Sequence, residues 1–363
     1  MERLSVSAIL VTWNSAEFLP RCLDALRRQT AEFAVDGWPL TDDARPTVNG
    51  QQPTDIELIH VDNASSDDSA AIVRHAFPGC TQIVNDTNRG FTGAVNQAIA
   101  RARGEFVLLL NPDAFLEPEY VGRIVAAMND AGQRFGMGTG KLMRATATDI
   151  VDSKGIRMTR TGRHLDVGQG LPDSDRVAGL RGFAVSGSPP PQPRNPATAQ
   201  PLYEVFGVSG AAAVYRMSFV RDVSIDGQFL DEDFFTYRED ADVAWRGRVL
   251  GWRALYVPAA AGVHVRRVTP EARRLLPESV NRDSVRNRFL LRLKNEGLYL
   301  ALRNAPFELW RDLLTIAAVL TVERSSLPAL AWLWKNRRRI MAKRRAIQSR
   351  RRTPDRELAG WFR

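Results

Sequence analysis

Residues Val6–Asn14, with the sequence VSAILVTWN, decide the fold, because an apolar run rich in β-branched side chains ends abruptly in polar ones. The pattern returns at Ile56–Val61, before Asp62-Asn63, and at Phe106–Leu110, before Asn111-Pro112-Asp113. Between these runs, apolar residues at helical spacing predict helices over Ser15–Gln29, Ser66–Ala76 and Thr92–Arg103. Short apolar strands alternating with helices indicate an α/β protein with a mostly parallel sheet buried on both faces. Ligands of such sheets bind beyond the carboxyl ends of the strands.

The composition is that of an ordinary globular protein. The chain has 363 residues, 44% hydrophobic and 25% charged, which predicts two domains or one large α/β domain with additions. Collagen-like, disulfide-scaffold and fully disordered classes are excluded. The net charge of +9 is unevenly placed: residues 331–363 hold 12 Lys and Arg against 2 Asp and Glu, and the remainder sums to −1. The basicity therefore belongs to the tail and not to the fold.

Compartment signals favour the cytoplasm. The chain has two cysteines, Cys22 and Cys80, which argues against an oxidising compartment. Its first residues lack a signal-peptide pattern, and no apolar run reaches the roughly 18 residues that a membrane-spanning helix needs. The nearest runs, Leu313–Val322 and Ser325–Trp334, are ten residues each and are separated by Glu323-Arg324. We expect a cytoplasmic protein, with peripheral attachment at the inner face of the cell membrane left open.

Two stretches interrupt the alternation of strands and helices. Residues 31–54 are polar and contain Pro and Gly, as in a surface insertion, and residues 171–200 include Pro189-Pro190-Pro191 and have almost no periodicity. This long loop is either a functional lid or disordered. Further on, the pattern predicts a helix at Glu239–Leu250, a strand at Arg253–Val257 and helices from Ser284 onward. We therefore predict a catalytic domain at residues 1–270 and a helical basic extension at residues 271–363.

Polar residues follow three strands: Thr12-Trp13-Asn14, Asp62-Asn63 and Asn111-Pro112-Asp113. Any one of these could be ordinary turn chemistry, but three in succession predict one polar rim. The chain lacks G-x-G-x-x-G after the first strand and lacks G-x-x-x-x-G-K-[ST] altogether, which disfavours a Rossmann dinucleotide site and a P-loop. What remains is a nucleotide held by carboxylates and amides, with a metal ion at its phosphates.

Four segments in order, Ser7–Asn14, Val61–Asp67, Asn88–Asn96 and Leu110–Asp113, resemble family-2 glycosyltransferases. The resemblance covers about residues 5–300 and is nearest to the bacterial rhamnosyltransferase branch and its galactofuranosyl relatives. It implies a GT-A fold: a mixed, mostly parallel sheet flanked by helices, here with a C-terminal helical extension. It also implies transfer of a sugar from a nucleotide diphosphate with inversion.

The resemblance assigns a donor site. The family's Asp-x-Asp motif stands here as Asn111-Pro112-Asp113, so Asp113 is the expected metal ligand, and Asn111 is expected to contact the ribose or a bound water. A plain turn after Pro112 is the alternative. We expect Asp62 to contact the nucleobase or ribose. The predicted nucleotide-sugar site consists of Thr12, Trp13, Asn14, Asp62, Asn63, Asn88, Arg89, Gly90, Gly93, Asn96, Asn111 and Asp113.

A second segment, Phe234–Arg246, resembles the family's acidic acceptor motif, which implies that Asp240 is the general base. Glu239 is placed with it in the catalytic pair, and Glu239 and Asp242 either orient the acceptor or support the site. Arg266 is a further predicted acceptor-binding residue. Three acids in the first turn of a helix could also simply match the helix dipole, which is the alternative to a catalytic role.

His264 follows Asp240 by 24 residues. A single histidine is usually structural, but a histidine at the matching place in the galactofuranosyl relatives binds the metal. The resemblance therefore implies a Mg²⁺ or Mn²⁺ site made by Asp113, His264 and two diphosphate oxygens.

The basic tail joins Trp310, Trp332 and Trp334 to a polybasic stretch, Lys335–Arg352. Tryptophans beside cations suit anionic lipid, and many relatives use lipid-diphosphate-linked acceptors. Nucleic acid would attract the same charge, but no recognisable nucleic-acid-binding module accompanies it, so we expect no nucleic acid partner. A solvated helix and a helix that forms a homodimer remain alternatives.

Together these features predict an inverting, metal-dependent glycosyltransferase that moves L-rhamnose from dTDP-rhamnose to a bacterial surface glycan or lipid-linked acceptor. UDP-galactofuranose is the alternative donor, and a non-catalytic nucleotide-sugar-binding or scaffold protein is the alternative class. The donor sugar, the acceptor and the linkage depend on the shape of the pocket, which the motifs do not specify.

Overall fold

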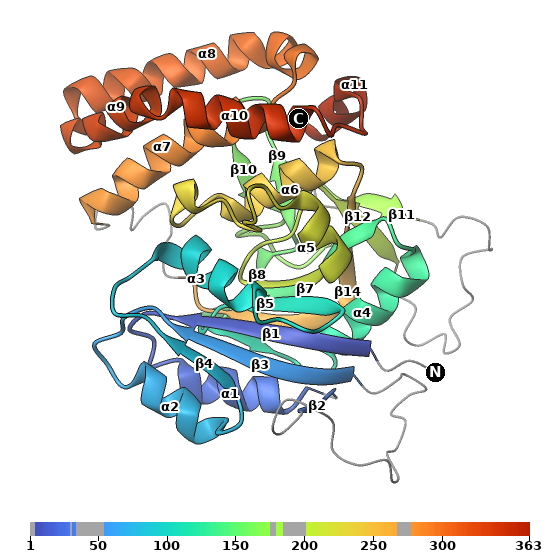
Figure 1. Cartoon of the computed structure of the whole chain (residues 1–363). Coiled ribbons are helices and arrows are strands. Elements are labelled where there is room, and N and C mark those ends of the chain that lie inside the picture. The colour runs from blue at the N-terminus through green and yellow to red at the C-terminus, as the bar shows by residue number, and fades with distance from the viewer. Residues whose placement is uncertain (1–3, 30, 34–53, 175–178, 184–200, 267–276) are drawn as a thin grey trace.

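The computed structural model describes residues 4–29, 31–33, 54–174, 179–183, 201–266 and 277–363. A large mixed sheet carries helices on both faces, and a layer of helices from residue 278 onward covers one end of the molecule (Figure 1). Most of the expected insertion at residues 31–54 and of the expected loop at residues 171–200 lies outside the described residues.

The N-terminal half of the sheet is parallel, as predicted. Strand β1 pairs with β3 on one side and with β5 on the other, and the register aligns Thr12 with Asp62. The elements of this half are β1 (Leu4–Thr12), α1 (Leu19–Arg27), β2 (Ala31–Phe33), β3 (Thr54–Asp62), α2 (Ser69–Ala76), β4 (Thr81–Val84), α3 (Gly90–Ile99) and β5 (Phe106–Leu110).

The second half mixes directions, because β13 is antiparallel to both β5 and β7, whereas β14 is parallel to β7. The strands of this half are β6 (Ala114–Leu116), β7 (Phe135–Arg144), β8 (Ala147–Ser153), β11 (Arg181–Phe183), β12 (Leu202–Val205), β13 (Ala212–Arg216) and β14 (Arg253–His264), beside a separate hairpin of β9 (Ile156–Met158) and β10 (His164–Asp166). Its helices are α4 (Tyr120–Ala131), α5 (Met217–Val223), the 3₁₀ turn η2 (Glu232–Phe234) and α6 (Glu239–Val249). The predicted fold class, a mixed sheet flanked by helices, is confirmed.

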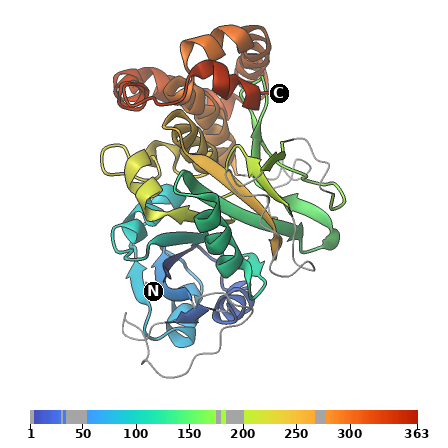
Figure 2. The same cartoon turned by 90° about the vertical axis from the view of Figure 1, so that its right-hand side faces the viewer.

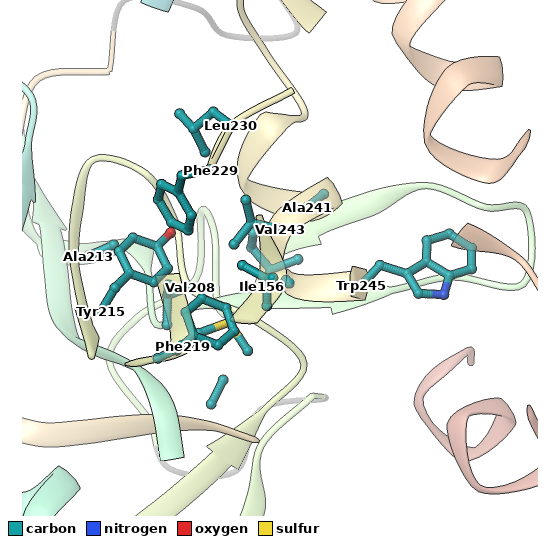
Figure 3. Packing of buried hydrophobic residues seen from close by; sticks show 14 of the residues in the cluster. Ile156, Val208, Ala213, Tyr215, Phe219, Phe229, Leu230, Ala241, Val243 and Trp245 are labelled. Carbon is teal, nitrogen blue, oxygen red and sulfur yellow. The ribbon is translucent and has the colours of Figure 1, made fainter. Parts of the chain in front are cut away.

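Strand β5 explains why the apolar runs read as continuous. All five of its residues are buried: Val107 and Leu109 pack into the core on one face of the sheet, and Phe106, Leu108 and Leu110 pack into the core on the other. A strand covered on both faces needs apolar side chains at every position. Tyr215 of β13, Phe219 of α5 and Phe229 pack together, with ring centroids 5.2–6.4 Å apart (Figure 3). This aromatic cluster supports α5 and α6.

The C-terminal helices lie together at the end of the molecule drawn uppermost in both cartoons (Figures 1 and 2). Helix α7 lies against α6, α9 and α10. These helical elements are α7 (Glu278–Asn295), α8 (Leu298–Thr321), η4 (Arg324–Ser326), α9 (Leu327–Lys335), α10 (Arg337–Gln348), α11 (Asp355–Leu358) and η5 (Ala359–Trp361). In the described part of the chain, no single helix is long and apolar enough to cross a membrane; α8 and the segment Arg324–Lys335 meet that test only as a pair bent by 109°.

A buried ionic cluster fastens this helical layer to the sheet domain. Lys294 of α7 is fully buried and contacts Asp231 and both carboxylate oxygens of Asp242, the latter at 3.1 Å. Lys343 of α10 contacts Asp231 at 2.6 Å and Asp233 at 2.8 Å. Buried charges are tolerated when they are paired and hydrogen-bonded, so this cluster joins α7 and α10 to the segment that precedes α6.

Removal of Lys294 tests the cluster. Because Lys294→Met leaves the buried carboxylates of Asp231 and Asp242 undercompensated, we expect the free energy of unfolding to fall by about 3–5 kcal/mol, measured by urea denaturation. The matched control is Arg28→Met, which breaks the solvent-exposed pair with Asp24 and should change stability by less than about 1 kcal/mol. Equal losses in the two variants would contradict the role of the cluster.

Candidate active site

Thr12 and Asp62 lie side by side at the ends of β1 and β3. The Thr12 hydroxyl donates to Asp62 at 2.9 Å, and the backbone N–H of Ser65 donates to the same carboxylate at 3.0 Å. Burial lowers the pKa of His60 to about 4, so its neutral ring donates from Nε2 to Thr12 Oγ1 and accepts at Nδ1 from Gln82, both at 2.9 Å. Asp62 is therefore held in one orientation at the rim, as parallel pairing predicted.

Asn63 organises the loop that leads into α3. Its side-chain oxygen accepts from the N–H of Arg89 at 3.0 Å, and its NH₂ group donates to Asn88 Oδ1 at 2.9 Å and to the carbonyl of Gly90 at 3.1 Å. Gly90 has φ +74°, and a Cβ there would lie 2.5 Å from the ring of Phe235, so only glycine fits. Asn63 thus builds this wall of the site, and the Arg89 side chain is exposed beyond it.

Other predicted donor residues divide into exposed and structural positions. The Trp13 side chain is 57% exposed, and Asn14 accepts from the N–H of Ser66 at 2.8 Å. Asn96 is different: its amide donates to the carbonyl of Leu230 at 2.8 Å and accepts from the N–H of Leu230 at 3.0 Å. Asn96 therefore ties α3 to the segment before α6, and Gly93 lies one turn earlier, where a Cβ would come within 3.2 Å of Arg89 Cβ.

The Asn111-Pro112-Asp113 motif meets His264 at the start of β6. Strand β6 pairs with β14 so that Ala114 lies opposite His264, and Asp113 Oδ1 lies 3.3 Å from His264 Nε2. The other ring nitrogen, Nδ1, lies 2.8 Å from Asp152. Burial alone would lower the pKa of His264, but Asp113 and Asp152 together raise it to about 9. The predicted pair of metal ligands is thus in contact, from segments about 150 residues apart in sequence.

Behind His264 lies a second ionic layer that the sequence did not predict. Arg266 contacts Asp152 and Asp166, each at 2.6 Å, and Ser153 donates to Asp166 at 2.8 Å. Burial raises the pKa of the Asp166 carboxyl, although the positive charge of Arg266 acts in the opposite direction. Arg266 was a predicted acceptor-binding residue; its guanidinium is instead engaged with two carboxylates. Asp152 and Asp166 belong to β8 and β10, and no motif marks them in the sequence.

The residues present fit a divalent cation. A carboxylate and an imidazole whose second nitrogen is held by another carboxylate is a common arrangement for a metal-binding histidine. Within residues that the structure describes, no group of three or more His, Cys, Asp and Glu side chains could hold a metal by itself. A cation held by Asp113 and His264 would therefore need further ligands from elsewhere, such as oxygens of a substrate.

The segment before α6 has an unusual backbone. Phe235, Tyr237 and Arg238 have φ of +62°, +64° and +71°, which costs of order 1–3 kcal/mol for each such residue. Asn287 of α7 is fully buried and compensates this strain, because its NH₂ group donates to the carbonyls of Phe234, Thr236 and Tyr237, each at 2.9 Å. Sequence reasoning missed Asn287, since an asparagine within a helix pattern carries no signal of a contact 50 residues away.

Asp240 follows this strained segment at the start of α6. It accepts from the N–H of Ala241 at 2.7 Å and from the N–H of Gly210 at 3.4 Å. Ala211, which follows Gly210 in the chain, accepts through its carbonyl from the N–H of Asn111 at 2.9 Å. Asp240 and the Asn111–Asp113 motif therefore lie at the same edge of the sheet. Burial, together with the charge of Asp166, raises the pKa of Asp240 to about 6.

Glu239 and Asp242 have opposite environments. Burial and the neighbouring charge of Asp240 raise the pKa of Glu239 to about 8, so it is neutral at pH 7. Asp242 is fully buried and accepts from Lys294, Asn295 and Arg246. Of the two roles predicted for Asp242, the structure leaves only support of the site, because every approach to this carboxylate is occupied by protein.

Comparison with known proteins finds a family match in the N-terminal part of the chain. Residues 7–139 match Glycosyl transferase family 2. Two similar proteins are a PGL/p-HBAD biosynthesis glycosyltransferase of Mycobacterium bovis, 29% identical over 128 residues (34% of this chain, 41% of the relative), and an N-acetylglucosaminyl-diphospho-decaprenol L-rhamnosyltransferase of Mycobacterium tuberculosis, 27% identical over 223 residues (58% and 66%). The chain spans about a third to two thirds of the length of the curated relatives it matches.

Solved structures share the fold over most of the chain. GalNAc-T7, solved with UDP, GalNAc and Mn²⁺, superimposes with a TM-score of 0.54 at 12% identity, covering 81% of this chain and 48% of that one. Staphylococcus aureus TarS 1–349 in complex with UDP-GlcNAc gives 0.51 at 17%, covering 95% and 88%. At such identities the likeness concerns the fold, which is the GT-A type predicted from the motifs. Residues 7–139 thus match the Glycosyl transferase family 2 model, and the rest of the chain shares the fold of solved glycosyltransferases.

Proposed function

We propose that this protein is an inverting glycosyltransferase that transfers a sugar from a nucleotide diphosphate to an acceptor hydroxyl. The observation that carries the proposal is the position of Asp240: a carboxylate with a raised pKa, at the edge of the sheet that also holds Asn111, Asp113 and His264. A base beside a half-formed cation site is what displacement of a diphosphate by a hydroxyl requires.

In the proposed mechanism Asp240 accepts the proton of the acceptor hydroxyl as that oxygen attacks the anomeric carbon. A pKa of about 6 makes Asp240 a stronger base than an ordinary carboxylate and keeps it mostly ionised at pH 7. Neutral Glu239 can donate a hydrogen bond beside it, and this pair of carboxyl groups with separated pKa values resembles acid–base pairs in other enzymes. Asn287 fixes the backbone that aims Asp240, so it is a positioning residue.

The donor site in this proposal consists of the rim residues described above. Asp113 and His264 would hold Mg²⁺ or Mn²⁺, and Asp152 would orient the histidine. When bound, such a cation offsets negative charge on the donor diphosphate. In this proposal Asp62 and the exposed ring of Trp13 contact the nucleoside, and Asn63 and Asn96 maintain the loops beside them.

We further propose dTDP-L-rhamnose as the donor and a lipid-linked or surface glycan as the acceptor, on the cytoplasmic side of the membrane. The support is the sequence motif and the mycobacterial relative named as an L-rhamnosyltransferase acting with N-acetylglucosaminyl-diphospho-decaprenol. UDP-galactofuranose remains the alternative donor. The proposed catalytic unit extends beyond residue 270 through α7, because Asn287 and Lys294 contact the segment that carries Asp240. A homodimer remains a proposal without a structural argument.

Substitution of the base is the first test. We expect Asp240→Asn to lower the rate of sugar transfer by about 10²–10⁴-fold, because the amide cannot accept the proton, while donor binding measured by calorimetry is unchanged. The matched control is Asp24→Asn on the exposed surface of α1, which should leave transfer unaltered. Transfer retained by Asp240→Asn would overturn the assignment of the base.

The pH profile provides a second test. Since Asp240 acts in its ionised form, kcat/KM should fall as the pH decreases through about 6 and should be level just above it. Part of the raised pKa comes from the charge of Asp166, so Asp166→Asn should move this acidic limb to lower pH. An acidic limb that stays in place in Asp166→Asn but vanishes in Glu239→Gln would assign the titration to Glu239 instead.

Cation binding provides a third test. We expect His264→Ala to weaken binding of Mn²⁺, measured by electron paramagnetic resonance in the presence of dTDP, by more than about tenfold. His75→Ala, on the exposed side of α2, is the matched control and should bind Mn²⁺ like the unaltered protein. Equal Mn²⁺ affinity in both variants would remove His264 from the proposed site.

A further inference from the structure

Helix α8 presents its apolar side outward. The side chains of Leu298, Leu302, Leu309, Trp310 and Leu313 are each more than 60% exposed. Further exposed apolar residues on or next to the helix are Tyr299, Phe307, Leu314, Leu320 and Val322. A helix at a water-facing surface normally shows the reverse pattern, with polar residues outside. A continuous apolar stripe along a 24-residue helix marks an interaction surface.

The charged side of α8 faces the protein. Its four charged residues, Arg303, Glu308, Arg311 and Asp312, are all buried or half-buried. Arg292 of α7 contacts Glu308 at 3.1 Å and Asp312 at 2.6 Å, and Arg288 contacts Asp312 at 3.0 Å. These ion pairs hold α8 on α7 with its apolar side away from the core. The exposure of the apolar stripe therefore follows from the ion pairs between α7 and α8.

Beyond the 109° bend, the end of α9 exposes a further aromatic side chain beside cations. Trp334 at the end of α9 is 71% exposed, and Arg337 lies 4.4 Å from the centre of its ring. The exposed cations here are Arg324, Lys335, Arg337 and Arg338. Between residues 313 and 354 the sequence has eleven Lys and Arg but a single carboxylate, Glu323. The surroundings of the apolar stripe are therefore strongly cationic.

Other cations of the tail serve the fold. Arg339 and Lys343 contact Asp233, and Arg350 and Arg352 contact Asp222. Of the polybasic stretch, the exposed cations Lys335, Arg337 and Arg338 at the end of α9, together with Arg324 at the bend, are therefore the candidates for a membrane contact.

We infer that the outer face of α8, together with Trp334 and the exposed cations at the bend and at the end of α9, is inserted into the headgroup region of a bilayer containing anionic lipid. Apolar side chains with aromatic residues and cations beside them match the boundary between acyl chains and anionic headgroups. Self-association through the same face would place the cations of both copies beside the interface without enough acidic residues to pair with them, which disfavours it. The ion pairs to α7 keep α8 attached to the protein, so it lies in the bilayer surface.

This arrangement deepens the proposed function, because it supplies the membrane at which a lipid-linked acceptor would be used. Helix α7 contacts α8 through Arg288 and Arg292 and contacts the segment before Asp240 through Asn287. One helix therefore separates the proposed lipid surface from the loop that carries the base. The membrane contact is tested by vesicle binding and not by sugar transfer. A negative result for membrane binding can therefore be distinguished from a negative result for the proposed activity.

The test is flotation of the full-length protein with vesicles of phosphatidylcholine, with and without about one third phosphatidylglycerol. We expect binding to the anionic vesicles, and a loss of about tenfold or more in the doubly substituted Trp310→Asp/Leu313→Asp variant. The matched control is Leu171→Asp, because Leu171 is 52% exposed on the sheet domain, and this variant should float like the unaltered protein.

Three results would overturn the inference. These are failure of the unaltered protein to float with anionic vesicles, equal flotation of the double variant, and a dimer in ultracentrifugation that the double variant converts to monomer. Circular dichroism and the urea midpoint of the double variant should match those of the unaltered protein, because both substituted side chains are exposed.

Discussion

Compensation of carboxylate charge at one edge of the sheet is the constraint on which this structure depends. The strand ends and the segments beside them gather acidic side chains, and cations from distant parts of the chain neutralise most of them. The pairs are Asp113 with His264, Asp152 with His264 and Arg266, Asp166 with Arg266, and Asp231 and Asp242 with Lys294. Asp240 instead accepts hydrogen bonds from backbone N–H groups, and its pKa is raised. The residue proposed for catalysis is thus a carboxylate that is held by backbone N–H groups and has a raised pKa.

The parallel half of the sheet could be predicted because its signals are local. An apolar run followed by Asp or Asn indicates the end of a strand wherever it occurs, and the register then brings Thr12 beside Asp62. The antiparallel insertion of β13 between β5 and β7 could not be predicted, since no local signal indicates that β13 pairs with segments about 100 and about 75 residues earlier. The roles of Asp152, Asp166 and Asn287 were missed for the same reason, because each contacts a partner that is distant in sequence and that no local motif indicates.

The interpretation of the C-terminal helices differs most between sequence and structure. From composition alone, all the cations of the tail were assigned to one lipid-binding surface. In the structure, Lys343 is buried in an ionic cluster with Asp231 and Asp233, and Arg352 pairs with Asp222, so these cations stabilise the fold. The apolar runs in this region are too short to span a membrane, and only the structure shows that the apolar side chains of α8 are exposed on the surface.

The sequence by itself determined the parallel alternation of strands and helices at the N-terminus and the polar rim, and its resemblance to a known family named Asp113, Asp240 and His264 as candidates, because short motifs carry these features locally. Only the tertiary structure decided that Asp113 contacts His264 and that Asp242 is closed to substrate. It also decided that Asn287 holds the strained segment before Asp240. Burial, pKa and partnership depend on which distant side chains share a low-dielectric environment, and that is set by the packing of the whole chain.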